Sequence, residues 1–435
     1  MPPLIKFYSR ENEAPMPIQK FAIVIIAIAC SASPSAAQSQ DAPAPNRLEL
    51  AQSVAIALAA NDPTIALFEE RALALEDRAI ADSQLPDPVF STRMQSIPLS
   101  SFDINREPMT QLALGVRQSF PKGKSRALTR QKRLAEALAE RHNKELRNRE
   151  ISLQTRQVWL ELFYWKQAKR ITQQTQTKVE ELREVSETNY ANGRGSAQNV
   201  LRVDLEVSLL ATKLIGLDRQ ADLSRVNLSR LIGIANAARP LPDVLPTLPP
   251  FPTATEMQSN LVRHPSVKVI DAMITARDRD IDLANQQYKP GFSIDAAYGL
   301  RDSRSDFGSI GVSYSIPLFT KNRQDRSLSA TRHLRSSARL ARSAQLLELN
   351  RQLGRHFADW TRLDEHINLY ETEVIGRATD TAEAAMLAYE TEAADFAELV
   401  RAELAVLDTE LALIRLQVDQ TKAHAALLFL KGEKS

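Results

Sequence analysis

Residues 290–319 have the sequence PGFSIDAAYGLRDSRSDFGSIGVSYSIPLF, in which apolar residues alternate with small or polar residues on both sides of a polar turn. The apolar set is Phe292, Ile294, Ala296, Tyr298 and Leu300 before the turn, and Ile310, Val312, Tyr314 and Ile316 after it. A period of two is typical of β-strands whose two faces differ, so this stretch predicts a β-hairpin. One face is apolar, and the other carries Asp295 and Arg301 among small residues.

A second hairpin is predicted in the first half of the chain. Leu112, Leu114 and Val116 alternate with small or polar residues, whereas the strand near 89–96 is less regular. About ten residues of such alternation suit a membrane strand, with its apolar face toward lipid and its polar face toward a wet lumen. The alternative is a pair of half-buried hairpins in a soluble sheet, and the charges of Arg117 and Asp295 on the polar face are its weak point.

Four strands are too few to close a barrel in a membrane. Open strand edges would leave backbone donors and acceptors without partners in lipid. If these strands lie in a membrane, closure requires other copies of the chain, and three protomers would give twelve strands.

The chain is predicted to be internally duplicated. The landmarks Pro63, Pro88 and Tyr190 recur about 200 residues later, in the same order, as Pro265, Pro290 and Tyr389. Each half is predicted to contain a helix, a hairpin, a long helix, a short turn and a further helix. The predicted boundaries are 38–238 for the first repeat, with its hairpin at about 88–119, 239–255 for a proline-rich linker, and 256–435 for the second repeat, with its hairpin at about 290–318.

Two of the predicted helices are very long. Residues 121–189 and 321–389 contain no proline after the first residue of each run, and each would extend on the order of 100 Å as one helix. Heptads run through the second of them, with apolar residues at Leu346, Leu353, Trp360, Ile367 and Val374. This spacing predicts coiled-coil packing between antiparallel neighbours, so His356 in the companion heptad position is expected to lie in a helix seam.

The N-terminus has the pattern of a secretion signal. The apolar run 21–30 follows Lys20 and precedes a segment of small residues, which predicts a signal peptide over 1–37 and a mature start at Gln38. The pattern begins best at Met16, which we expect to be the true start. Cys30 also ends a degenerate lipobox, so the alternative is an acylated Cys30. Either alternative takes the chain out of the cytoplasm.

Composition argues against several classes of function. The net charge of +2 creates no strong field for nucleic acid, and the single cysteine and six dispersed histidines predict neither a metal site nor a cofactor. No nucleophile elbow or phosphate loop is present, so we expect no enzymatic activity.

Taken together, these features resemble the TolC-type outer-membrane efflux family over nearly all of the mature chain. The resemblance rests on the order of several weak motifs: the NDP and RHP helix starts at 61–63 and 263–265, the LPDP and YKP hairpin entries, SIPLF at 315–319, YANG at 190–193 and LSRLIG at 228–233. The closing helix, 401–432, resembles the CzcC/CusC-like heavy-metal efflux branch.

The resemblance implies a fold that is mainly α with membrane β. Three protomers would form a twelve-strand barrel in the outer membrane, continued by a helical barrel across the periplasm, with an equatorial belt built from the linker and the chain ends. It implies a passive exit duct that works with a periplasmic adaptor and an inner-membrane pump of the RND type, with metal cations as one cargo. The alternatives are the outer-membrane component of type I protein secretion and a periplasmic coiled-coil scaffold.

The resemblance also assigns residues. Two helix–helix turns would meet the adaptor, and their residues are Tyr190, Gly193, Gly195 and Ser196 in the first, and Tyr389, Glu392 and Asp395 in the second. Glu392 stands where the family usually has glycine. Glu398 and Arg401 fall at the periplasmic constriction, where a ring of Glu398 would favour cations. The alternative is an ordinary helix-surface pair between these two residues.

Overall fold

The computed structural model describes residues 47–60, 62–302, 304–391 and 396–431. The signal peptide, Met16 and Cys30 lie outside these residues, as do Glu392 and Asp395 of the second predicted turn. The first repeat contains the helices α1 (Leu50–Ala59), α2 (Pro63–Ala81), α3 (Ser125–Ala191), α4 (Ala197–Ile232) and α5 (Ile234–Ala237). The second contains α6 (Ala254–Asn260), α7 (Pro265–Gln286), α8 (Gln324–Leu369), α9 (Ile375–Glu390) and α10 (Phe396–Lys431).

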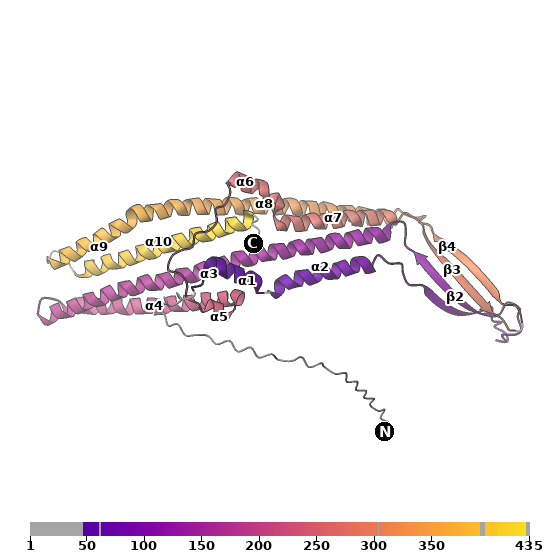
Figure 1. Ribbon diagram of the computed structural model, residues 1–435, viewed down its shortest axis with the longest axis horizontal. Coiled ribbons are helices and arrows are strands. Elements are labelled where there is room, and N and C mark those ends of the chain that lie inside the picture. Colours follow the sequence, from indigo (N-terminus) through magenta and orange to yellow (C-terminus); the bar gives the residue numbers. More distant parts are fainter. Residues whose placement is uncertain (1–46, 61, 303, 392–395, 432–435) are drawn as a thin grey trace, which may run out of the picture. The chain divides into compact units, whose positions relative to one another are not determined.

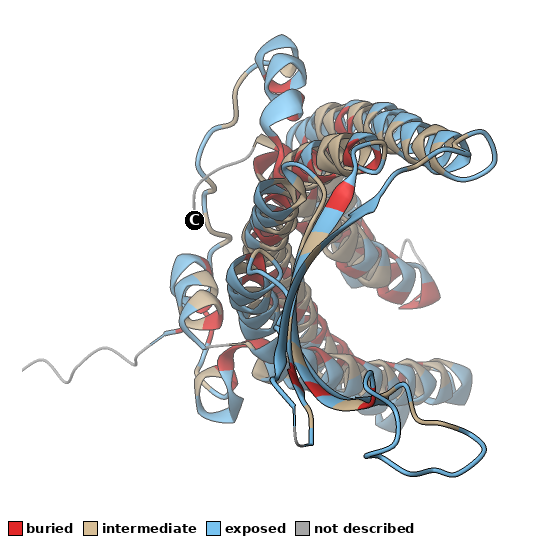
Figure 2. Cartoon of the chain, turned by 90° about the vertical axis from the view of Figure 1, so that its right-hand side faces the viewer, coloured by how far each residue is buried: buried red, intermediate tan, exposed pale blue. Residues whose placement is uncertain are grey.

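The two predicted hairpins join into a single antiparallel sheet. Its strands are β1 (Val89–Gln95), β2 (Gln111–Phe120), β3 (Gly291–Leu300) and β4 (Phe307–Ser315), in that order across the sheet. The central pairing of β2 with β3 brings together the two repeats, with Val116 opposite Ala296. Figure 2 shows that this sheet is strongly curved.

The helix α3 is the central element of the helical layer and contacts helices along its whole length. Along its first half, α2 packs through ion pairs such as Arg141–Glu76, and α7 packs through Lys132–Asp280. Along its second half, α4 and α10 take these positions, and α7 and α10 in turn pack against α8. At 67 residues, α3 is about 100 Å long, which lets two shorter helices share each of its flanks.

The largest buried cluster surrounds the middle of α3. Trp159 is fully buried there, stacks on Phe163 at 5.6 Å between ring centroids, and donates from Nε1 to the Leu48 carbonyl at 3.0 Å. The Leu48 amide donates to the carbonyl of Pro240 at 2.8 Å. The segment before α1 and the proline-rich linker are therefore tied to the same level of the helical layer.

The prediction of one unbroken second long helix was wrong. A π-helical turn, Tyr370–Val374, separates α8 from α9. A π turn holds one extra residue, so it moves the apolar stripe on by one position. The burial pattern follows this shift: Leu353 and Ile367 are buried at heptad positions before the turn, but after it Ala382 is buried where the heptad expects Thr381.

Candidate functional site

The two faces of the sheet differ in chemistry and in exposure. On one face lie large apolar side chains that are largely exposed, including Phe90 at 78% and Ile310 at 84%. On the other face, Ala113, Gly291 and Gly299 are buried, and the Gln111 side chain lies over Gly299. In a curved sheet the concave face is the less accessible one, so the small and polar residues line the concave side. A hollow of ≈ 1000 Å³ lies against all four strands at mid-sheet.

Charged groups lie in one row across the small-residue face. Arg117 on β2 is opposite Asp295 on β3, and Asp295 is opposite Gly311 on β4. A Cβ atom at Gly311 would come within 2.5 Å of the Asp295 carboxylate, so glycine leaves room for this side chain. A row containing both charge signs needs water or partners, which suits a wet lumen better than a dry core.

The alternation predicted that Arg301 lies on the polar face of the strand, and the structure places it elsewhere. It follows the last residue of β3, and its guanidinium lies 3.7 Å from the centre of the Phe307 ring. The same group donates to the Pro108 carbonyl at 3.0 Å. Arg301 therefore joins the β3–β4 connection to the β1–β2 connection at the end of the sheet.

Both the sheet and the helical layer have open, apolar edges. Strands β1 and β4 are each paired on one side only among the described residues. Exposed apolar side chains also lie on the outermost helices of the layer: Leu201, Leu205, Leu209, Ile215, Leu223 and Val226 on α4, and Leu340, Leu347 and Leu387 on α8 and α9. Apolar surface of this extent is typical of an interaction surface.

The first helix–helix turn is formed as the sequence predicted. The helix α3 ends at Ala191, and α4 begins at Ala197 after Ser196, whose side chain accepts from the Asn199 amide. Gly193 has φ +71°, a conformation that favours glycine. The amide of Gly195 donates to the Asn189 carbonyl at 3.1 Å, and Tyr190 is 53% exposed.

Replacing Gly193 with alanine is expected to destabilise this turn by about 1–2 kcal/mol, because a side chain disfavours the left-handed conformation. Gly216 offers the matched control, since it is helical and a Cβ atom there meets nothing within 4 Å. Gly216→Ala is expected to stabilise by about 0.5–1 kcal/mol. Thermal unfolding and hydrogen exchange at the turn would measure both. Changes of the same sign in the two variants would contradict the prediction.

A hydrogen bond links the end of α9, just before the second turn, to the end of α3, just before the first turn. The hydroxyl of Tyr389, near the end of α9, accepts a hydrogen bond from Asn189 Nδ2 of α3 at 2.9 Å. The Tyr389 ring also packs edge-on against buried Phe396, at 5.1 Å between centroids. Sequence reasoning missed Asn189, because only the tertiary approach of two distant segments creates this hydrogen bond.

Glu398 and Arg401 lie on the first turns of α10 and are both exposed. Arg401 Nη1 donates to Glu398 Oε2 at 2.6 Å. The structure therefore contains the helix-surface pair that the sequence allowed. It describes one chain, so the constriction ring stays a prediction.

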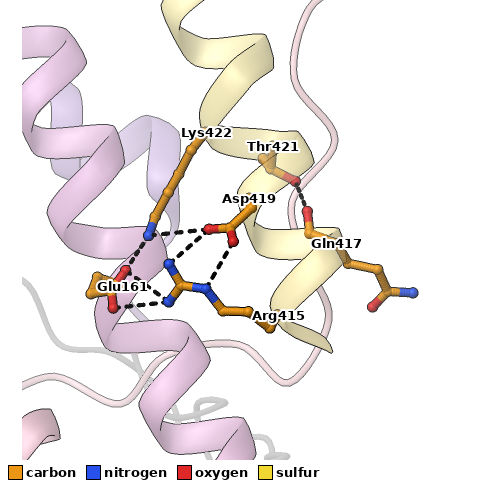
Figure 3. A network of polar contacts seen from close by, with 6 residues as sticks. All are labelled: Glu161, Arg415, Gln417, Asp419, Thr421 and Lys422. Atoms are coloured by element: carbon orange, nitrogen blue, oxygen red, sulfur yellow. Dashed lines mark hydrogen bonds and ion pairs between the residues drawn. The ribbon is translucent and has the colours of Figure 1, made fainter. Parts of the chain in front are cut away.

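A network of ion pairs joins α3 to α10 (Figure 3). Glu161 of α3 accepts from Lys422 and from Arg415 Nη1, the latter at 3.1 Å, and Arg415 also pairs with Asp419 at 2.8 Å. Burial alone would raise the pKa of the Glu161 carboxyl, but the hydrogen bonds and charges of Lys422 and Arg415 outweigh it and hold this pKa below its usual 4.5. No sequence pattern predicted this network.

Because the pKa of Glu161 is lowered by folding, its contribution to stability is present above about pH 4.5 and is lost as the pH falls through the lower folded value. Glu161→Gln is therefore expected to be less stable than the wild type at pH 7, with the difference shrinking below about pH 4.5. Thermal unfolding of both proteins between about pH 7 and 3.5 would measure it. The control is Glu150→Gln, a half-exposed acid on the same helix that pairs with Arg147, three residues before it. A difference that is constant with pH would contradict the assignment.

No single helix among the described residues is long and apolar enough to cross a membrane. The pair α1 and α2 passes by length and composition together, but it is bent by 41°. Within the same residues, no group of three or more acidic, histidine or cysteine side chains could hold a metal ion.

The comparison with protein families gives a match to the second half of the chain. The family model described as outer membrane efflux protein matches residues 257–433. These residues belong to the outer membrane efflux protein family. The match spans the second repeat from α6 to the end of α10, and so includes β3, β4 and the second turn. No curated protein sequence matches the chain.

Solved structures of membrane proteins share the fold over most of the chain. The outer membrane protein VceC of Vibrio cholerae is 18% identical, with a TM-score of 0.75 over 88% of this chain and 96% of that one. A membrane protein of Pseudomonas aeruginosa is 17% identical, with a TM-score of 0.77 over 89% and 92%. CusC, described as forming a transmembrane channel, is 13% identical, with a TM-score of 0.74 over 91% and 96%. The predicted TolC-like fold is therefore confirmed.

Proposed function

We propose that three copies of this outer membrane efflux protein assemble into a passive exit duct. The sheet carries the argument: it has four strands, an apolar convex face, a concave face with charges, and two free edges. Such a sheet can satisfy its edges in lipid only by pairing β4 of one copy with β1 of the next. Three copies would close a twelve-strand barrel whose apolar face meets lipid and whose polar face lines the channel.

The helical layer supports the same assembly. Its two apolar edges, α4 on one side and α8 with α9 on the other, are different surfaces. Contact between unlike surfaces closes into a ring when the rotation is right, whereas an isologous dimer would pair each edge with itself. Ring closure would continue the barrel as a helical duct across the periplasm.

The turns at the far end of the helices are the proposed meeting point with a periplasmic adaptor and an inner-membrane pump, and the resemblance implies a pump of the RND class. Tyr190, Gly193, Gly195 and Ser196 form one turn, and Tyr389, Glu392 and Asp395 belong to the other. The hydrogen bond between Asn189 and Tyr389 holds the two turns of one chain together, so adaptor contact with either turn would act on both.

Native mass spectrometry of the protein extracted from outer membranes in detergent tests this proposal. Three chains per complex are expected, and the mass of each chain distinguishes a start at Gln38 from an acylated Cys30. Reconstitution of the complex in a planar bilayer should give discrete conductance steps. A monomer that stays soluble without detergent would overturn the duct and favour the periplasmic scaffold.

At the proposed constriction, the pair of Glu398 with Arg401 would leave a ring with little net charge. Arg401→Gln is expected to free three Glu398 carboxylates and to shift the channel toward cations, seen as a change in reversal potential across a salt gradient. Arg362→Gln is the matched control, since Arg362 pairs with Glu365 at the same spacing and at 2.6 Å. An equal shift of the reversal potential in both variants would contradict the placement of Glu398 and Arg401 at the constriction.

For the cargo, we propose metal cations, selected by the pump and adaptor rather than by the duct. The resemblance of the closing helix to the CzcC/CusC-like branch supports this choice. A strain lacking the gene should lose metal tolerance, and unchanged tolerance would contradict the metal assignment without affecting the duct. Retention of a secreted protein in that strain would instead favour type I secretion.

A further inference from the structure

A cavity lies away from the proposed channel, where α1, α3, the proline-rich linker and the end of α10 meet. Its volume is ≈ 390 Å³, and most of its lining is apolar, including Val54 and Leu58 of α1, Pro249 of the linker, and Leu428 and Phe429 of α10. This volume falls within the range of small-molecule sites. The proposed function assigns no role to this cavity.

One wall of the cavity carries a buried guanidinium group with unused donor capacity. The Arg149 side chain is only 9% exposed, and its Nη2 donates to Glu145 Oε1 at 2.8 Å. Its Nη1 is buried and has no hydrogen-bond partner among the described residues. An unpaired donor on a buried charged group is costly, and an anion in the cavity would compensate the charge of this guanidinium group. Arg156, which has an interaction of its own, also lines the cavity.

The surroundings leave positive charge in excess. Glu145 is shared among Arg149, His142 and Lys268, whose nitrogen atoms lie 2.8, 3.7 and 3.9 Å from its carboxylate. His264 packs behind the cavity wall, with its ring 5.2 Å from the ring of Phe429. Burial and the charge of Arg149 lower the pKa of His264 to about 4, so this histidine is neutral at physiological pH.

We propose that this cavity binds a small amphiphilic carboxylate, with the carboxylate paired with the Arg149 guanidinium group that lines one wall and the alkyl chain lying against Val54, Leu58 and Leu428. A carboxylate carries the single negative charge that would pair with the Arg149 guanidinium group. A phosphate monoester would bring more charge and more acceptors than this wall can satisfy. The bound chain would tie α1 to the end of α10, two elements far apart in the sequence.

The test is calorimetric titration of sodium octanoate into the protein in lipid nanodiscs, with empty nanodiscs as the blank because octanoate partitions into bilayers. One octanoate per chain is expected. Acetate, which lacks the chain, and octanol, which lacks the charge, should not bind at this site. Binding of octanol with equal affinity would overturn the carboxylate assignment.

Two variants address the two ends of the ligand. Arg149→Gln should weaken octanoate binding about tenfold or more, by removal of a charged hydrogen bond. Val54→Phe keeps every charge and fills the apolar end, so it should also weaken binding, which keeps the test valid if Arg149→Gln fails to fold. Arg351→Gln, an exposed arginine on α8, should bind as the wild type does. Affinity unchanged in Val54→Phe, or no binding beyond the blank, would overturn the proposal.

Discussion

Ile294→Arg is expected to abolish insertion of the assembled protein into the outer membrane. Ile294 lies on the apolar face of β3, opposite Gln118 and Val312, and is 42% exposed. If this face meets lipid, an arginine there costs about 2–4 kcal/mol in each chain near the middle of the membrane. Three copies multiply that cost. Fractionation of membranes and native mass spectrometry of the extract would measure the loss.

Ser293→Arg is the matched control for this prediction. Ser293 is the neighbouring residue on the same strand, and its side chain lies on the opposite, small-residue face, across from Ser119 and Ser313. There an arginine would point into water, so assembly should persist and only conductance should change. If Ser293→Arg blocked insertion and Ile294→Arg did not, the two faces would be assigned the wrong way round.

Trp159→Ala is expected to destabilise the protein by about 3–5 kcal/mol, because it empties a fully buried aromatic site. It also removes the Nε1 donor, which leaves the Leu48 carbonyl without this hydrogen bond and loosens the segment before α1. Thermal unfolding followed by circular dichroism would measure the change.

Trp159→Phe separates the two causes. The phenyl ring keeps most of the packing against Phe163 but cannot donate a hydrogen bond, so a smaller loss of about 1–3 kcal/mol is expected. Leu347→Ala, at a residue 72% exposed on α8, should change stability little in the isolated chain. If Trp159→Phe and Trp159→Ala cost the same, the hydrogen bond rather than the packing would dominate this site.

The faces of the strands could be predicted because they depend only on local alternation. Asp295 and Ile294 lie on opposite faces of the sheet, as the period of two requires. The helix reversal at 190–196 could be predicted because Gly193 allows the left-handed backbone conformation that the turn needs. The pairing of β2 with β3 could not be read from either hairpin alone, since it depends on how two segments far apart in the sequence meet.

The features that were missed are tertiary. Asn189 and Glu161 have nothing unusual around them in the sequence, and each gains its role from a residue more than 190 positions away. The π turn was missed for a different reason: the heptad runs regularly up to Val374, and only the burial of Ala382 reveals that one extra residue has been taken up.

A π turn takes up one extra residue while a long helix stays continuous. The turn at 370–374 interrupts the second repeat, and α3, its counterpart in the first repeat, runs without a break over 67 residues. If the two halves arose by the predicted duplication, they are therefore no longer interchangeable. In a ring of three chains, the three α3 helices would alternate with the three α8–α9 helices. A partner with true sixfold symmetry would therefore meet two different kinds of surface around the ring.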